Sequence, residues 1–283
     1  MAILPLSAAT EDPRDRLQKI LAGYKNAVLA FSGGVDSALL LDAAAKTMGR
    51  NNVLAVTVES AINPPGEVEE ARRLAKSAGV EHMVVAMNPM LDEAFVSNPP
   101  LRCYHCKRKI MGLMLDIARD RGVEHLLDGA NADDTGDYRP GMRAAREMGV
   151  KSPLLEAGLT KQDIRALSRR LGLPTADKPS AACLASRFPY GTRITARALE
   201  MVAAAEVFLA RKGFAQVRVR YHGHLARIEV PTEEVPALLV DSDAISGRLK
   251  KLGFIYVTID LQGYRTGSMN ETIPDAKVNN ESR

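Results

Sequence analysis

The sequence Ser32-Gly33-Gly34-Val35-Asp36-Ser37 lies between an apolar run and a stretch of strong helix formers. The apolar run, residues 27–31, predicts a buried β-strand, and residues 38–45 predict a helix. A strand, a glycine-rich turn and a helix N-terminus together form an anion site, because the first backbone N–H groups of the helix have no partner inside it. The stretch therefore predicts a binding site for phosphate groups.

The glycine-rich turn differs from two common phosphate-binding loops. It lacks the Gly-Lys-Ser/Thr ending of a Walker A loop and the G-x-G-x-x-G spacing of a dinucleotide fingerprint. Gly33 and Gly34 allow the main chain to approach a ligand, and Ser32 and Ser37 add hydroxyl donors. The turn resembles the S-G-G-x-D-S signature of the PP-loop ATP pyrophosphatases. We expect Asp36 to hold Mg²⁺ on the phosphates of ATP; the alternative is that its charge only stabilises the helix N-terminus.

The composition is that of an ordinary soluble globular chain. The 283 residues are 46% hydrophobic and 25% charged, with a net charge of +4 and a pI near 8.9. No apolar run is long enough to span a membrane and no secretory signal is present, so we expect a cytoplasmic protein with no membrane partner. The mild positive charge suits anionic ligands and does not by itself indicate nucleic acid.

Apolar runs alternate with helical segments in the first half of the chain, which is typical of a parallel sheet covered on both faces. The predicted strands cover residues 27–31, 53–58, 83–86 and 126–129. We therefore predict an α/β fold over residues 1–180, with a PP-loop parallel sheet of the adenine nucleotide alpha hydrolase type. A small α+β domain over residues 181–275 and a flexible tail over residues 276–283 complete the prediction.

A β-hairpin with strictly alternating residues is predicted in the second half. Segments 217–221 and 226–230 flank a His-Gly-His-Leu turn. The alternation places Arg218 and Arg220 together on one face, which we expect to be exposed. Arginine is the preferred residue for bidentate phosphate recognition, so this face is a candidate phosphate site. On composition alone, a solvated strand face with cross-strand ion pairs explains the pattern better.

Three cysteines carry further chemistry. Cys103-Tyr104-His105-Cys106 forms a C-x-x-C motif at a predicted helix start, and Cys183 lies in a long irregular loop. The thiols fit three ligands of a [4Fe–4S] cluster with one open iron, a zinc site completed by an imidazole such as His105, or a redox dithiol with an unrelated third cysteine. Basic neighbours, among them Arg102 and Lys107, are expected to lower the pKa of the thiols.

Two loops carry further candidate site residues. Asp128 and Gly129 follow a predicted strand at the mouth of the expected site, and the aspartates after them are candidates for orienting Mg²⁺ or a ribose; a solvated acidic loop is an equal alternative. Ser186 and Arg187 lie in the irregular loop of Cys183, which indicates a ligand or nucleophile beside an anion site. A surface loop with a solvated arginine explains that segment equally well.

These motifs together resemble the LarE family of ATP-dependent sulfur transferases, which help to build the nickel-pincer cofactor of lactate racemase. The most specific strings are Asp137-Tyr138-Arg139-Pro140-Gly141 and Ser186-Arg187-Phe188-Pro189-Tyr190-Gly191. The other resembling segments cover residues 31–37, 128–136, 217–229 and 260–270. The resemblance thus extends over nearly the whole chain.

The resemblance implies a two-stage reaction. ATP adenylates a carboxylate of pyridinium-3,5-biscarboxylic acid mononucleotide with release of pyrophosphate, and a sulfur donor then displaces AMP to leave a thiocarboxylate. Asp36 and Cys183 are implied to be catalytic. The residues implied to bind ATP or the phosphate of the substrate are Ser32, Gly33, Gly34, Asp36, Ser37, Gly129, Ser186, Arg187, Arg218 and Arg220.

The number of cysteines distinguishes this chain from family members that give up the sulfur of a single cysteine. With Cys103 and Cys106 added to Cys183, it resembles the subgroup in which three cysteines hold a [4Fe–4S] cluster with an extra sulfide. That implies catalytic rather than sacrificial sulfur transfer. The implied partners are sulfide or another sulfur donor, other proteins of nickel-pincer biosynthesis, and further copies of the chain in a homo-oligomer, commonly a hexamer in the family.

Two other ATP-using functions share parts of the pattern. A tRNA thiolase of the related PP-loop group also combines this loop with three cysteines, but the second half lacks a long basic surface rich in aromatic residues, so nucleic acid is not an expected partner. An amide-forming ligase of the NAD or GMP synthetase kind needs no metal-binding cysteines.

Overall fold

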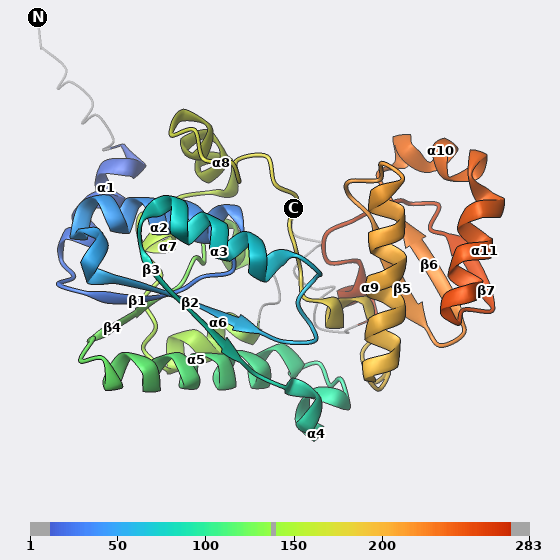
Figure 1. Cartoon of the computed structure of the whole chain (residues 1–283), viewed down its shortest axis with the longest axis horizontal. Helices are drawn as coiled ribbons and strands as arrows, with labels where there is room; N and C mark the ends of the chain where they lie inside the picture. The colour runs from blue at the N-terminus through green and yellow to red at the C-terminus, as the bar shows by residue number, and fades with distance from the viewer. Residues whose placement is uncertain (1–11, 137–139, 273–283) are drawn as a thin grey trace, which may run out of the picture.

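The first half of the chain folds around a four-stranded parallel sheet. The computed structural model describes residues 12–136 and 140–272. The strands are β1 (Ala27–Ala30), β2 (Val53–Glu59), β3 (Glu81–Ala86) and β4 (His125–Leu127). Their order is β3-β2-β1-β4, so that β1 pairs in parallel with both β2 and β4 (Figure 1). This sheet confirms the predicted α/β fold.

Helices lie on both faces of this sheet (Figure 1). They are α1 (Pro13–Ala22), α2 (Val35–Met48), α3 (Glu67–Ala78), α5 (Arg102–Asp120), α6 (Pro140–Glu147), α7 (Pro153–Glu156) and α8 (Lys161–Arg170), whereas the short α4 (Glu93–Val96) packs in the core of the second half. Ala27 and Leu29 of β1 pack in one core with α1, α2, α3 and α8, whereas Val28 packs in a second core with α5 and α6. Successive strand residues point to opposite faces, so one apolar strand supplies both cores.

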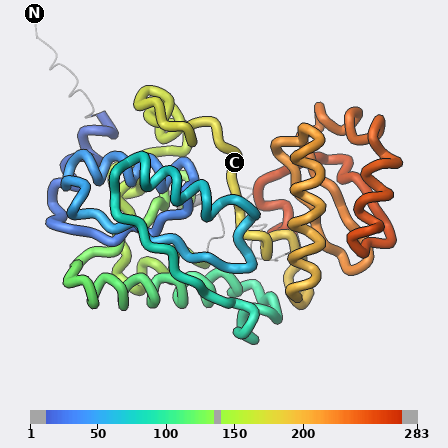
Figure 2. The backbone as a smooth tube through the Cα atoms, in the orientation of Figure 1, coloured from blue at the N-terminus to red at the C-terminus, as the bar shows by residue number. Residues whose placement is uncertain are grey.

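The second half forms a mixed three-stranded sheet with its own helices, and Figure 2 traces the chain from one half to the other. Its elements are α9 (Ala196–Arg211), β5 (Arg218–His222), β6 (Leu225–Glu229), α10 (Val235–Val240), α11 (Ser242–Leu252) and β7 (Tyr256–Ile259). β5 and β6 pair antiparallel, and β6 and β7 pair in parallel. The arrangement is of the predicted α+β type, while the domain limits stay a prediction.

The core of the second half includes residues from the first. Ile62, Phe95 and Val96 are buried in the same cluster as side chains of α9, β5 and β6. Backbone hydrogen bonds follow the same route: the Leu184 N–H donates to the Ile62 carbonyl at 2.9 Å, and the Ile194 N–H donates to the Val96 carbonyl at 2.8 Å. The segment that carries Cys183 is therefore anchored to the first half by both packing and hydrogen bonds.

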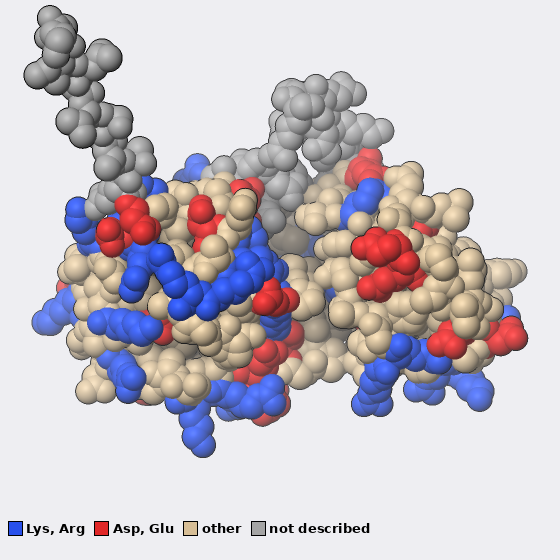
Figure 3. Space-filling view, turned by 90° about the horizontal axis from the view of Figure 1, so that it is seen from above, with Lys and Arg blue, Asp and Glu red and all other residues tan. Residues whose placement is uncertain are grey.

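Charged side chains of both signs occupy the face shown in Figure 3. Lys and Arg form a band over the first half, and a group of Asp and Glu side chains lies on the second half. In the part of the chain that the structure describes, no helix is both long enough and apolar enough to cross a membrane.

A buried hydroxyl and an imidazole support the carboxyl end of β1. Thr57 Oγ1 donates to the Phe31 carbonyl at 2.6 Å and lies 2.8 Å from His82 Nε2. Burial and, next, the charge of Arg72 lower the pKa of His82. The neutral imidazole is therefore the favoured form in the folded protein.

We predict that His82 lowers stability at acid pH. Because the pKa of His82 is lower in the folded than in the unfolded chain, the unfolded chain binds the proton first, and the free energy of unfolding falls as the pH drops below about 6.5. Urea unfolding at about pH 7.5 and about pH 5.5 measures this loss, which should be smaller in His82→Gln than in the wild type. Equal losses in the two proteins would contradict the prediction.

Candidate functional site

The glycine-rich turn connects β1 to the first turn of α2. Gly33 has a φ of 72°, and a Cβ at this position would lie 3.2 Å from Ala71 Cα, so the turn requires glycine here. Gly34 is the N-cap of α2, and no described side chain caps the helix, which leaves N–H groups of its first turn available to an anion. The hydroxyls of Ser32 and Ser37 lie 3.3 Å apart beside the turn. This geometry suits a phosphate group.

The chain after β4 approaches the same helix end. A Cβ on Gly129 would lie 3.2 Å from Ser37 N and 3.3 Å from Asp36 Cβ, so the close approach depends on glycine. The fold thus brings Gly129 together with Asp36 and Ser37, as expected for residues beyond the carboxyl ends of neighbouring strands.

Asp36 is paired with a lysine that the sequence patterns did not indicate. Lys161 Nζ lies 2.5 Å from Asp36 Oδ2, and Asn131 Nδ2 donates to the other carboxylate oxygen at 3.2 Å. Lys161 begins α8, where a capping box between Thr160 and Asp163 holds the helix start. The carboxylate for which we predict Mg²⁺ therefore already contacts one cation, the ammonium group of Lys161. The magnesium assignment itself stays a prediction.

A second lysine, Lys178, connects the long irregular loop that carries Cys183 (the cysteine loop) to the glycine-rich turn. Lys178 Nζ lies 2.8 Å from both Glu67 Oε2 and Glu70 Oε2 of α3 and donates to the Gly33 carbonyl at 3.2 Å. Its side chain is only 12% exposed, so these ion pairs are largely shielded from solvent. No local sequence signal marks Lys178, because its partners come from two other elements.

The three cysteines come together from two segments. Cys103 and Cys106 lie in the first two turns of α5, and Cys183 precedes the 3-10 helix η4 (Leu184–Arg187). The thiols interact electrostatically with one another and none is in a disulfide. Among the described residues, no three His, Cys, Asp or Glu side chains form a group ready to hold a single metal ion.

Burial, rather than nearby cations, controls the acidity of the inner thiols. Burial and, after it, Cys183 and Cys103 raise the pKa of Cys106 to about 12, although Arg102 and Lys107 act in the opposite direction. Burial likewise raises the pKa of Cys183. The prediction that basic neighbours lower the pKa of these thiols is therefore wrong for both, because loss of hydration outweighs the attraction.

The donor set of Cys103, Cys106 and Cys183 fits an iron–sulfur cluster. Three protein thiolates leave one iron of a [4Fe–4S] cluster open, and each thiolate binds a different iron. The sulfurs of such a site therefore need not stand as close together as around one ion. Metal binding at these thiols has to displace their protons.

Arg102 begins α5 and is buried beside the thiols. The side chain is 4% exposed, and it donates to Ala185 O at 2.8 Å and to Cys103 Sγ at 3.5 Å. Burial lowers the pKa of Arg102, but Cys103 and Cys183 act against burial and the net shift is upward. The sequence marks Arg102 only as one of several basic residues around the C-x-x-C motif, and it does not predict that this side chain is buried.

The aspartates after β4 are held in place by hydrogen bonds. Their donors are Ser152 Oγ for Asp128 at 2.8 Å, the Lys161 N–H for Asp133 at 2.8 Å and the Asn131 N–H for Asp134 at 3.0 Å. These contacts give the aspartates structural roles, and the contribution to Mg²⁺ or ribose binding stays a prediction.

Residues 137–139 of the motif Asp137-Tyr138-Arg139-Pro140-Gly141, which resembles the LarE family, lie outside the described residues, and Pro140 begins α6.

The arginine face of the hairpin is buried, so its predicted exposure is wrong. Arg218 and Arg220 are 7% and 5% exposed, and the fully buried Glu229 lies 2.6 Å from Arg220. Segments outside the hairpin cover this face, since Arg218 donates to the Ser180 carbonyl and Arg220 donates to Ser268 Oγ at 3.1 Å. Strand alternation indicates which residues share a face, but not what covers it.

Arg187 connects the arginine face to the cysteine loop. It is buried, makes two contacts of 2.9 Å with the carboxylate of Glu206, and donates to the Cys183 carbonyl at 3.1 Å. Arg187 also donates to Ser186 Oγ at 2.8 Å, and the Ser186 carbonyl accepts from Arg220 at 3.1 Å. The candidate residues thus form two groups: one at the glycine-rich turn, and one that combines the thiols with the buried arginines.

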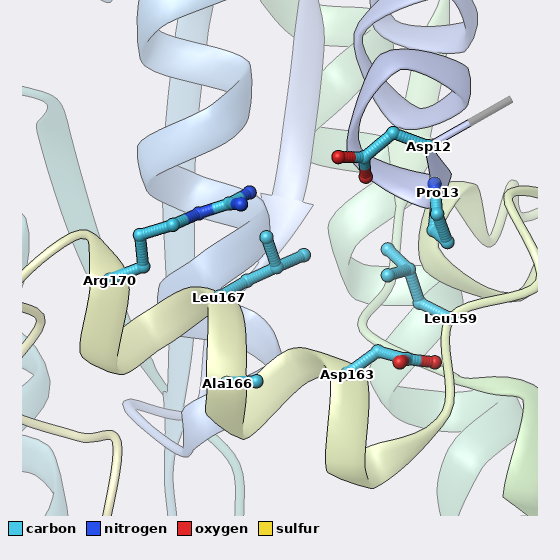
Figure 4. A pocket seen from close by; sticks show the side chains of 7 residues that line it. All are labelled: Asp12, Pro13, Leu159, Asp163, Ala166, Leu167 and Arg170. Atoms are coloured by element: carbon cyan, nitrogen blue, oxygen red, sulfur yellow. The ribbon is translucent and has the colours of Figure 1, made fainter.

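A pocket lies apart from both groups, between α1 and α8 (Figure 4). It is lined by Asp12, Pro13, Leu159, Asp163, Ala166, Leu167 and Arg170. Its two acidic lining residues, Asp12 and Asp163, cap α1 and α8.

Comparison with protein families defines the class of the first half. The family model described as NAD synthase matches residues 10–105, which include the glycine-rich turn. An NH3-dependent NAD+ synthetase of Trichlorobacter lovleyi is 38% identical over 86 residues, 30% of this chain and 31% of that protein. Together with the parallel sheet, these matches identify the first half as an NAD synthase-like PP-loop domain, which supports ATP-dependent chemistry.

Two relatives match nearly the whole chain. A pyridinium-3,5-bisthiocarboxylic acid mononucleotide synthase of Lactiplantibacillus plantarum is 38% identical over 278 residues, 98% of this chain and 99% of that protein. An uncharacterized protein of Synechocystis is 40% identical over 265 residues, 93% of this chain and 98% of that protein. The chain therefore belongs to the family of pyridinium-3,5-bisthiocarboxylic acid mononucleotide synthases, and the predicted resemblance to the LarE family is confirmed.

We predict that Gly129→Ala weakens ATP binding. The added Cβ would lie 3.2 Å from Ser37 N and force the first turn of α2 to shift, and we expect a misplaced site to cost about tenfold in affinity. Calorimetric titration with a non-hydrolysable ATP analogue measures the effect. Gly247→Ala in α11, where an added Cβ meets no atom within 4 Å, is the control and should bind as the wild type does. Equal affinity in all three proteins would contradict the prediction.

Proposed function

We propose that the protein is an ATP-dependent sulfurtransferase that converts the carboxylates of pyridinium-3,5-biscarboxylic acid mononucleotide to thiocarboxylates. The main support for this proposal is the path of a single loop. Through Lys178 this loop contacts the glycine-rich turn, and it then supplies Cys183 and Arg187 to the group of thiols and buried arginines. This connection supports the assignment of carboxylate activation and sulfur transfer to one chain of the synthase family.

The first stage activates a carboxylate. One of its oxygens attacks the α-phosphorus of ATP, the bond from that phosphorus to the bridging oxygen breaks, and pyrophosphate leaves. We assign the ATP phosphates to Ser32, Gly33, Gly34, Ser37 and Gly129 around the first turn of α2. N–H groups fixed in position stabilise the charge that develops on the phosphate oxygens. Asp36 would hold Mg²⁺ there, and Lys161 supplies a further positive charge beside it.

The second stage replaces AMP by sulfur. A sulfur nucleophile attacks the activated acyl carbon, the bond to the AMP oxygen breaks, and a thiocarboxylate remains. We assign the sulfur centre to Cys103, Cys106 and Cys183, with Cys183 as the catalytic cysteine. These three thiolates would hold a [4Fe–4S] cluster, which would supply the sulfur chemistry of the site and would have one iron without a protein ligand. Repetition on the second carboxylate gives the bisthiocarboxylate that a nickel-pincer cofactor such as that of lactate racemase requires.

The buried arginines are assigned to the phosphate of the mononucleotide, together with Ser186. Arg218 has no ion-pair partner among the described carboxylates, and Arg220 Nε is buried without a hydrogen-bond partner there. An unsatisfied buried donor such as Arg220 Nε is costly, and a phosphate supplies several acceptor oxygens. Arg187 already donates to Glu206, Ser186 and the Cys183 carbonyl, so its assignment to the phosphate rests on the family resemblance.

Family membership also supports proposals about the setting of the reaction. We propose a cytoplasmic homo-oligomer, hexameric as is common in the family. Its partners would be sulfide or another sulfur donor and other proteins of nickel-pincer cofactor biosynthesis. Neither a membrane nor a nucleic acid belongs to this proposal.

We predict that Cys183→Ala separates the two stages. Anaerobic reactions with ATP, Mg²⁺, the biscarboxylic mononucleotide and sulfide allow pyrophosphate and thiocarboxylate to be measured in the same sample. The variant should release pyrophosphate within about threefold of the wild type, because the thiol acts after adenylation, and should lose thiocarboxylate formation by at least about 100-fold.

Two carboxylate variants on α2 provide the matched comparison. Asp36→Asn should lose both products, whereas Asp42→Asn, which removes a carboxylate paired with Lys46 on the same helix, should keep both. A Cys183→Ala protein that still forms thiocarboxylate at the wild-type rate would contradict the proposed function.

A further inference from the structure

Arg102 is a buried cation that contacts a cysteine sulfur and the ring of Tyr190 but no carboxylate of the described residues. Two of its hydrogen-bond acceptors, Asn98 Oδ1 and the Ala185 carbonyl, are neutral oxygens. Within the described residues, no carboxylate forms an ion pair with it; its NH2 group donates to Cys103 Sγ at 3.5 Å, and its guanidinium carbon lies 5.6 Å from the centre of the Tyr190 ring. A buried guanidinium needs an anion to offset its lost hydration, so the charge of Arg102 is available to an anion at the thiols.

Asn98 holds this guanidinium in place. It is fully buried with a φ of 55°, and its Nδ2 donates to the Pro189 carbonyl at 2.7 Å and the Thr192 carbonyl at 3.0 Å. Its side-chain oxygen accepts from Arg102 at 2.5 Å. These carbonyls belong to the segment that follows Cys183, so one residue supports both the start of α5 and the cysteine loop. The guanidinium is thus positioned before any ligand arrives.

The accessible side of this arrangement is the side of Cys103. Arg102 donates to Cys103 Sγ from its NH2 group, whereas its NH1 group is occupied by Asn98 and Ala185. Cys103 is exposed, whereas the Arg102 side chain is 4% exposed. An anion that enters at Cys103 therefore meets a fixed N–H donor and a permanent positive charge.

We propose that Arg102 is an anion-binding residue of the sulfur site, where its positive charge draws hydrosulfide to the centre that Cys103, Cys106 and Cys183 form. The proposal rests on the proposed function, because hydrosulfide is the small monoanion that would supply the sulfur. A guanidinium suits this ligand, since it is itself weakly hydrated and remains protonated throughout. Arg102 exchanges no proton in this role; it binds and orients the anion.

Two thiol reagents of different charge test the proposal. Iodoacetate is an anion and iodoacetamide is neutral, and both react with the thiolate of Cys103, so the ratio of their rates is independent of the thiolate fraction. Peptide mass spectrometry gives both rates at Cys103 in reduced protein treated with a chelator. We expect Arg102→Gln, which keeps N–H donors for its carbonyl partners, to lower the ratio of iodoacetate to iodoacetamide rates by at least about threefold.

Two variants control for charge and for structure. Arg102→Lys keeps the positive charge and should keep the ratio within about twofold of the wild type. Arg108→Gln removes one charge from the exposed side of the same helix, where Arg108 contacts the Tyr104 hydroxyl, and should also leave the ratio unchanged. A purely structural role of Arg102 would raise both rates together in Arg102→Gln and leave the ratio unchanged, which would overturn the proposal.

If Arg102→Gln fails to fold, a measurement on the wild type alone still tests the proposal. The ratio at Cys103 should exceed that of N-acetylcysteine amide, and the excess should disappear at about 1 M salt; equal ratios at low salt would overturn the proposal. The alkylation needs neither ATP nor a cluster. If the wild type forms no thiocarboxylate, the proposed function fails, but the ratio of alkylation rates at Cys103 is unaffected. If Arg102→Gln leaves that ratio unchanged, the role of Arg102 fails, but the proposed function is unaffected.

Discussion

The first turn of α2 presents backbone N–H groups that no described side chain caps, and the other parts of the first site are arranged around them. N–H groups at a helix start have no partner within the helix, and leaving them unsatisfied in a buried place costs free energy. Gly33 turns the chain into the helix, and Gly129 allows the chain after β4 to come close. Asp36 and Lys161 add paired charges beside the turn. We propose that a nucleotide phosphate completes the hydrogen bonding that folding leaves open here.

The position of the second site depends on ion pairs at both ends of the cysteine loop. Lys178 is held by two glutamates of α3, and Arg187 is held by Glu206 of α9. Removing one partner of a buried pair leaves an uncompensated charge and costs about 3–5 kcal/mol. Cys183 lies between these two anchors in a segment with little regular structure. The ion pairs, the backbone bond from Leu184 to Ile62 and the packing of Leu184 and Ala185 in the core together fix the position of its thiol.

Much of the fold could be predicted because the patterns that determine it are local. The ends of the apolar runs 27–31 and 53–58 agree with those of β1 and β2 to within one residue. Six consecutive residues are enough to predict the turn between β1 and α2. The pairing of Asp36 with Lys161 could not be predicted, because it joins residues 125 positions apart and exists only after α8 packs beside α2. Burial of Arg218 and the high pKa of Cys106 likewise depend on segments that cover them from elsewhere in the chain.

Iron and acid-labile sulfide analysis of anaerobically purified protein tests most directly whether Cys103, Cys106 and Cys183 form one sulfur centre. We predict about four irons per chain in the wild type and loss of the iron in Cys183→Ala, since each thiolate binds a different iron of the cluster. A colourless wild-type protein with about one zinc per chain, the stoichiometry of a single-ion site, would contradict this assignment, as would full iron content in Cys183→Ala.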